Sequence, residues 1–226
     1  MTKGILLAGN TSALLSAVEI EVAKREDRYA LAAIPNRFSV LRENHTGASL
    51  DASVEKARIL LDWNQGSAVS ARALVLAAEN RLGRVHEAIL VCSPPEVPCA
   101  IAELRPVDIE VLAGDHVKSW FFLVRELIAS FRSKGQGSLV LVYPEAVGDK
   151  DNDTEVMGSV AAAAFRALAR RLMAVTPDEP YVVQGFTGGE AGHDTAFASF
   201  MFRQLDDTRR RVHGKLHKYG KSGFFK

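Results

Sequence analysis

The chain has 226 residues, with 28 Lys and Arg against 27 Asp and Glu and a formal net charge of +1 at pH 7. This balance argues against a dedicated nucleic-acid binder or a polyanionic protein, and no apolar stretch reaches the roughly 20 residues of a membrane span. The N-terminal segment lacks the flanks of a signal peptide, and two cysteines are too few for a disulfide framework. We therefore expect a soluble cytoplasmic protein.

Short apolar runs alternate with longer stretches of helical periodicity along most of the chain. In chain order we predict a strand at 4–8, a helix at 11–25, strands at 29–34 and 58–61, a helix at 67–81, a strand at 88–92, a helix at 107–134, a strand at 138–143, a helix at 154–175 and a strand at 181–184.

The predicted strands are continuously apolar rather than alternating, which is typical of a parallel sheet covered by helices on both faces. Right-handed crossovers then give an α/β fold with a single doubly wound, Rossmann-like sheet. We expect one domain over residues 1–207, followed by a basic C-terminal tail at 208–226.

The loop after the first predicted strand reads Ala8-Gly9-Asn10-Thr11-Ser12-Ala13-Leu14-Leu15. Its position and flanks resemble the Gly-x-x-x-Gly-x-Gly loop of the short-chain dehydrogenase/reductase (SDR) family. Further segments similar to that family are 61–63, 80–85, 116–122 and 137–142, so the resemblance extends through most of the chain. It implies a Rossmann-like fold with a dinucleotide at the carboxyl ends of the strands.

The resemblance also implies which residues would contact that cofactor. They are the loop residues Gly9, Asn10, Thr11 and Ser12, then Asp62 beside the adenine, and Ser93 after the fourth strand. Of the three loop glycines only Gly9 is present, because Ala13 and Leu15 occupy the other two positions. Since those glycines let the backbone approach the pyrophosphate, we expect Leu15 to add bulk where the cofactor would lie.

The family's catalytic residues are missing at the matching positions. Its Ser falls on Pro144, and its Tyr and Lys fall near Met157 and Ala161. No tyrosine anywhere in the chain is followed four residues later by a lysine. The family's reaction needs a tyrosine whose pKa is lowered by a nearby lysine, so that it can pass a proton to the carbonyl. The resemblance therefore predicts the fold but not the standard reaction.

Arg37 follows the second predicted strand, where dinucleotide folds contact the adenosine ribose. An Arg there can hold the 2′-phosphate of NADP, whereas an acidic residue would favour NAD. If a dinucleotide binds, we expect NADP. The alternative is a solvated Arg at the start of the next helix, and no cofactor at all is an equal expectation.

Tyr143 and His116 are the candidate catalytic residues. Tyr143 and Glu145 flank the end of the fifth predicted strand, and Asp115 precedes His116 in a helix expected nearby. A His beside an acid can act as general acid or base near neutral pH, and a tyrosine can donate a proton. The alternative, which we favour, is a polar rim around an inactive cleft.

Three other motifs are weaker. Cys92 ends a predicted strand and is interpreted as a small buried hydrophobe rather than a nucleophile. Residues 149–153 have the Asp-x-Asp-x-Asp rhythm of a calcium loop, but Thr154 and Val160 replace the Gly and Glu that such a loop needs, so we expect a solvated loop. His213 and His217 have the spacing of a helical metal pair without a third ligand, and no metal is predicted.

The segment 185–192 holds four glycines and is either a ligand lid or a linker into the last helix. The helix at 117–131 has a wide apolar arc, and the helix at 154–173 is rich in alanine. In the family resembled here these two helices form the dimer interface, which implies a homodimer or homotetramer.

Seven of the 28 Lys and Arg residues follow Asp207 and no acidic residue does, so the rest of the chain holds 21 basic and 27 acidic residues. We expect the tail at 209–226 to lie across an acidic surface of its own or a partner subunit, with nucleic acid as the weaker alternative. No nucleic-acid contact is expected elsewhere.

Two hypotheses for the function follow. In the first, the chain is an SDR-like pseudoenzyme with a binding, sensing or scaffold role. In the second, it is an atypical NADP(H)-dependent oxidoreductase that acts on a small carbonyl or hydroxyl substrate and uses Tyr143, His116 or water.

Overall fold

The computed structural model describes residues 3–25, 28–34, 58–93, 99–144, 156–174, 178–188, 193–207 and 212–220. Seven strands in this part of the chain form one sheet, in which every neighbouring pair is parallel and the order is β3-β2-β1-β4-β5-β6-β7. The strands are β1 (Gly4–Asn10), β2 (Arg28–Ile34), β3 (Arg58–Leu60), β4 (Glu87–Val91), β5 (Gly137–Pro144), β6 (Tyr181–Gly188) and β7 (Lys215–Tyr219).

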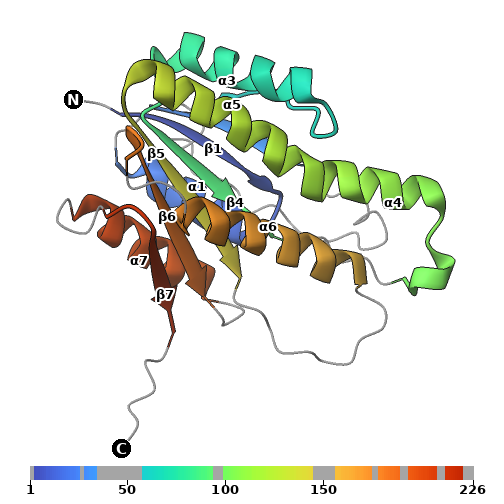
Figure 1. Cartoon of the computed structure of the whole chain (residues 1–226). Helices are drawn as coiled ribbons and strands as arrows, with labels where there is room; N and C mark the ends of the chain where they lie inside the picture. Colours follow the sequence, from blue (N-terminus) through green and yellow to red (C-terminus); the bar gives the residue numbers. More distant parts are fainter. Residues whose placement is uncertain are drawn as a thin grey trace, which may run out of the picture.

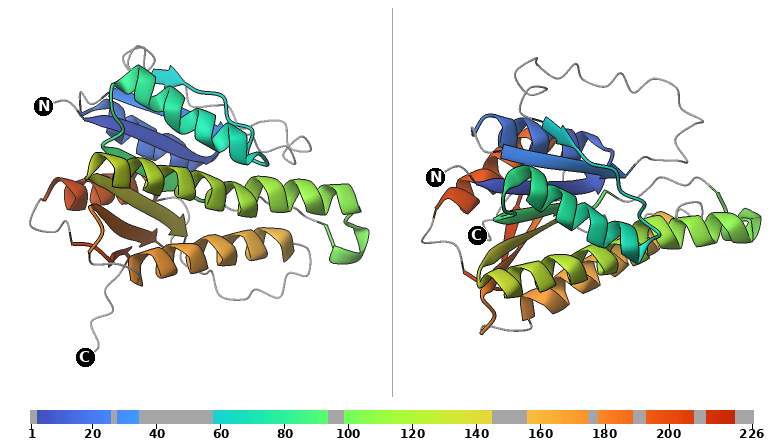
Figure 2. Two further views of the ribbon diagram at one scale, coloured as in Figure 1. Left: turned by 45° about the horizontal axis from the view of Figure 1, so that its top comes forward. Right: turned by 90° about the horizontal axis from the view of Figure 1, so that it is seen from above.

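Helices cover both faces of this sheet (Figures 1 and 2). The helices are α1 (Ala13–Ala23), α3 (Ala68–Leu82), α4 (Pro106–Ala113), α5 (Ser119–Lys134), α6 (Val156–Ala174) and α7 (Asp194–Asp206). One apolar core lies between the sheet and α3, α5 and α6, and a second lies between the sheet and α1 and α7. This is the predicted doubly wound, Rossmann-like architecture.

The strands form where the sequence is continuously apolar. Every residue of β1 and of β4 is buried, as expected for inner strands of a sheet that is covered on both faces. None of the helices in the described part of the chain is long and apolar enough to cross a bilayer.

The predicted helix at 107–134 is interrupted by a π-helical turn, η3 (Gly114–Lys118), between α4 and α5. The turn matters for the site because it places Asp115 and His116 in the interior, where both are buried. Single π-helical turns often mark functional positions. Periodicity over the whole segment predicts the helix but not this local widening.

Two segments expected to be loop or tail are strands instead. Gly185–Gly188 continues β6, so this part of the glycine-rich segment is neither a lid nor a linker. Lys215–Tyr219 lies within the expected tail but forms β7, which pairs with β6 at the sheet edge. His213 lies in a turn and His217 in that strand, so the helical pair considered above does not form.

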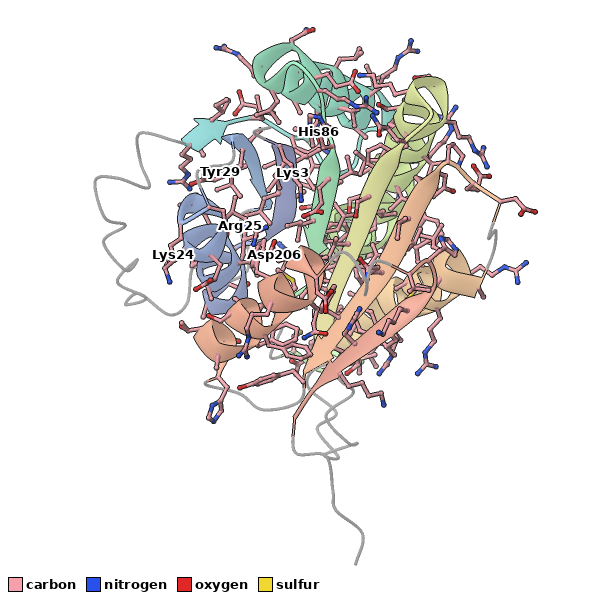
Figure 3. All side chains as sticks on the ribbon, turned by 90° about the vertical axis from the view of Figure 1, so that its left-hand side faces the viewer. Lys3, Lys24, Arg25, Tyr29, His86 and Asp206 are labelled. Atoms are coloured by element: carbon pink, nitrogen blue, oxygen red, sulfur yellow. The ribbon has the colours of Figure 1, made fainter. Side chains whose placement is uncertain are left out.

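Hydrogen-bonded pairs of polar groups lie at the amino ends of the strands (Figure 3). Arg25, which follows α1, donates to both carboxylate oxygens of Asp206 of α7, and the Tyr29 hydroxyl donates to the buried Glu19, 3.1 Å away. The backbone N–H of Gly4 donates to His86 Nδ1 at 2.9 Å. Because ligands of doubly wound sheets bind at the other end, the carboxyl ends are the place to look for a site.

Candidate functional site

The candidate site lies where β1 and β4 end side by side. Strands β2 and β3 lie on one side of β1, and strands β4 to β7 lie on its other side. The strand order therefore reverses its direction between β1 and β4, and this position is the topological switch point of the sheet. Asn10 is the last residue of β1, Ser12 caps the following helix, and Ser93 follows β4. The topology therefore brings these three predicted residues to one edge.

Hydrogen bonds join those residues to His116 of η3. The backbone N–H of Ser93 donates to Asn10 Oδ1 at 3.1 Å, and the Ser93 hydroxyl donates to Ser12 Oγ at 2.9 Å. Asn10 Nδ2 lies 2.8 Å from His116 Nδ1. Four of the residues singled out from the sequence, from four separate elements, thus form one connected network.

The network fixes the state of His116. A backbone N–H can only donate, so Asn10 accepts with its oxygen and must donate its amide N–H to His116 Nδ1. The remaining hydrogen of the neutral ring is then on Nε2. Burial lowers the pKa of His116 to about 4. His116 is therefore neutral at pH 7 and serves there as a hydrogen-bond acceptor for Asn10.

Ser12 caps α1, because its hydroxyl accepts the backbone N–H of Leu15 at 3.1 Å. The expectation for Leu15 itself is wrong. Its side chain is buried in the core between the sheet, α1 and α7, rather than standing where a cofactor would lie. The residue that accommodates it is Gly9, where an added Cβ would lie 2.9 Å from Leu15 Cδ1 and 2.7 Å from the Val91 carbonyl oxygen.

Two of the other predicted cofactor residues are exposed. Thr11 is exposed beside the start of α1, and Asp62 is exposed in the segment after β3, next to the buried Trp63. Arg37 and Glu145 lie outside the described residues, as does the loop at 149–153.

Tyr143 is not part of the hydrogen-bond network around His116. It is buried in the core beneath α6, with its ring 6.1 Å from that of Phe165, and no hydrogen bond joins its hydroxyl to another described residue. Burial raises the pKa of its phenol, and the nearby Arg170 and Arg166 oppose that rise. Within the described part of the chain, no hydrogen bond thus joins the two candidate catalytic residues.

Cys92 is buried, and burial raises the pKa of its thiol to about 12. A thiol in that state is not a nucleophile at pH 7, which confirms its interpretation as a small hydrophobe.

A surface groove of about 510 Å³ lies between α1 and α7, but the carboxylates lining it are already bonded within the protein, Glu21 to Lys24 and Asp206 to Arg25.

The start of α1 offers backbone N–H groups of the kind that hold a phosphate group. The first N–H groups of a helix have no partner within it, and Ser12 takes only that of Leu15, so those of Ala13 and Leu14 are left at the helix end.

No protein-family model matches the sequence, and neither does any curated protein sequence. Solved structures do match the fold. A short-chain dehydrogenase from Mycobacterium smegmatis superposes with a TM-score of 0.73 at 12% identity, over 97% of this chain and 93% of its own. NADH-dependent reductase A1-R′ complexed with NAD gives 0.73 at 12% identity, over 96% and 95%. A short-chain dehydrogenase/reductase from Serratia marcescens BCRC 10948 gives 0.71 at 13%, over 96% of each chain.

These likenesses define the class of fold: an SDR-like Rossmann sheet that spans nearly the whole chain. The matched proteins are named as dehydrogenases and reductases. At 12–13% identity the likeness extends to the fold alone, so the chemistry has to be argued from the residues of this chain.

Proposed function

We propose that this chain is a Rossmann-type binding protein that holds a nicotinamide dinucleotide at the start of α1 and lacks standard dehydrogenase chemistry. The observation that carries the proposal is the Ser12–Ser93–Asn10–His116 network. It organises a phosphate-binding edge, while the family's reacting positions hold Pro144, Met157 and Ala161.

In this proposal the chain's own residues bind and orient. Ser12 fixes the first turn of α1, so that the free N–H groups and the positive end of the helix dipole face the phosphates. Ser93 holds that turn against the end of β4. A bound dinucleotide would supply hydride chemistry, but the neutral His116 and the buried Tyr143 hydroxyl do not supply the accompanying proton at pH 7.

The second candidate is an atypical NADP(H)-dependent oxidoreductase acting on a small carbonyl or hydroxyl substrate. It is favoured by the fold shared with a reductase that is complexed with NAD, and by the Nε2–H of His116, which would donate a hydrogen bond to a carbonyl oxygen while water supplies the proton. The preference for NADP over NAD rests on Arg37, and Arg37→Glu should weaken NADPH binding more than NADH binding.

The test is a titration with NADPH followed by fluorescence of the two tryptophans, Trp63 and Trp120, which pack 5.9 Å apart. Ser12→Ala should weaken binding about tenfold, since it loosens the phosphate-binding turn. Ser67→Ala removes the matching cap of α3 and should leave binding unchanged. A wild-type protein that does not respond to NADPH at about 1 mM would overturn the proposal.

We also propose a homodimer or homotetramer through α5 and α6. Phe121 on α5 and Val160 on α6 are large apolar side chains that are half exposed, which is costly for a monomer when such residues gather on one face. With both cysteines free, the proposed location is the cytoplasm.

The remaining basic residues of the expected tail, outside β7, are proposed to lie on an acidic surface of this chain or its partner. Nucleic acid is the alternative. Binding to nucleic acid that falls steeply with salt, and that is lost when residues 221–226 are deleted, would favour the alternative.

A further inference from the structure

Three side chains at the carboxyl ends of β5, β6 and β7 lie in one row. Tyr143 is the register partner of Thr187, and Thr187 is the register partner of Lys218. Register partners on adjacent strands project from the same face of a sheet. That face is the one covered by α6, because Tyr143 packs on Phe165 and a Cβ at Gly185, two residues before Thr187, would lie 2.8 Å from Met173 Sδ. Figure 1 shows α6 along this side of the sheet, with β7 at its edge.

Two members of this row have hydroxyl groups without partners. Tyr143 and Thr187 are each 3% exposed, and neither hydroxyl forms a hydrogen bond with a described residue. Buried polar groups in native proteins are nearly always satisfied, so two orphans on adjacent register positions indicate a common partner outside the described residues.

Two cationic groups lie near the Tyr143 hydroxyl. Arg166 and Arg170 lie one turn apart on α6, both act electrostatically on the Tyr143 phenol, and neither forms an ion pair with a described residue. Lys218 adds a third positive charge from β7, and α6 carries no acidic residue. Arg166 is partly buried and Arg170 is exposed. An anion beside the two hydroxyls would pair with guanidinium groups, whereas a single water would satisfy only a hydroxyl.

We propose that Tyr143, Thr187, Arg166 and Arg170 form a binding site for an oxyanion, the phosphate or carboxylate group of a small molecule. In this site the two hydroxyls donate to the anion from the sheet, and the guanidinium groups donate from α6. The site is separate from the start of α1, and it does not depend on the proposed dinucleotide function.

The site is tested by isothermal titration calorimetry of the full chain with inorganic phosphate and, separately, with acetate. To remove the contribution of the α1 start, the titrations are repeated in the Ser12→Ala background. We expect Arg170→Gln to weaken binding about tenfold, and Tyr143→Phe and Thr187→Val, which delete only a hydroxyl or replace it by a methyl, to weaken it several-fold.

Arg171→Gln is the matched control, since Arg171 is an exposed arginine on the same helix that does not act on Tyr143. It should leave the affinity unchanged. Binding of phosphate without acetate assigns the site to a phosphoryl group, and the reverse assigns it to a carboxylate; either supports the proposal. Equal losses of anion affinity in Arg171→Gln and Arg170→Gln would overturn the proposal. So would the absence of binding heat with either anion at about 10 mM.

The two proposals of this article fail separately. Arg170→Gln and Thr187→Val should retain wild-type NADPH binding, whereas Ser12→Ala should retain the anion site beneath α6. Circular dichroism melting of each variant shows that a loss of binding is not a loss of folding.

Discussion

His116 lies in η3 with Nδ1 held 2.8 Å from the Asn10 amide, and burial lowers its pKa to about 4. In the unfolded chain the same group titrates near 6.5. Between pH 6.5 and 4 the unfolded chain therefore binds more protons than the folded chain, so the free energy of unfolding falls as the pH falls through this window. Above pH 6.5 the group makes no pH-dependent contribution.

His116→Asn should remove this dependence. We expect the wild type to lose about 2 kcal/mol more stability than the variant between pH 7 and pH 5, because only the wild type then takes up a proton on unfolding at this position. Urea denaturation of both proteins at the two pH values measures the difference. Identical pH dependences would contradict the neutral, buried state of His116.

The sequence predicts that a glycine is required at position 9, but it does not predict the physical reason for this requirement. The resemblance implies a cofactor contact, whereas the structure gives a packing requirement, since a Cβ would lie within 2.9 Å of Leu15 and closer still to the Val91 carbonyl. Leu15 could not be placed from the sequence, because the helical spacing does not tell whether position 15 faces the site or the core.

Gly9→Ala should therefore lower the free energy of unfolding by about 1–3 kcal/mol, because the methyl group forces β1, β4 and α1 apart. Gly66→Ala is the control, with its nearest atom 3.9 Å from the added Cβ, and should change stability by less than about 0.5 kcal/mol. Chemical denaturation compares them. A neutral Gly9→Ala would show that this contact relaxes without cost.

At the scale of whole elements, the inner strands and the helices were predictable, since continuous apolar runs and helical periodicity follow directly from burial on two faces. The end of β6 was not, because Gly185 and Gly188 are residues typical of loops. A glycine stands at position 185 of this strand because the side chains of Met173 and Leu216 leave too little room for a Cβ atom. The edge strand β7 was missed because Lys215 and Lys218 are exposed and mask its apolar positions.

The caps of α1 and α3 allow a direct comparison between two elements. Ser12 and Ser67 each accept a backbone N–H of their own helix, but only Ser12 also accepts the hydroxyl of Ser93. Ser67→Ala should cost about 1 kcal/mol of stability, and Ser12→Ala more, because its loss also leaves Ser93 without that partner. Equal costs in urea denaturation would show that the contact between α1 and β4 contributes nothing.

At the scale of the whole molecule, the near-zero net charge conceals an uneven distribution, with seven positive charges after Asp207. The structure places two of them, Lys215 and Lys218, on the edge strand β7.

The site of hydrogen-bonded polar residues at the switch point was predictable in part, since the topology brings Asn10, Ser12 and Ser93 together. The row under α6 was not, because it depends on the register of β5, β6 and β7.

The proposed assembly depends on the exposed apolar side chains of α5 and α6. The double change Phe121→Glu and Val160→Glu should convert an oligomer to a monomer, because it places charges in the proposed interface. Val69→Glu on α3, a more exposed apolar position away from these helices, should leave the mass unchanged. Light scattering after gel filtration reports the mass, and a monomeric wild type would rule the assembly out.

The most direct test of the central claim follows binding and turnover in one sample. NADPH is added to the wild-type protein with a panel of small aldehydes and ketones, while tryptophan fluorescence and NADPH absorbance are recorded together. We expect a saturable change in the fluorescence of Trp63 and Trp120 and no loss of NADPH absorbance. Oxidation of NADPH that requires both the protein and a carbonyl compound would contradict it.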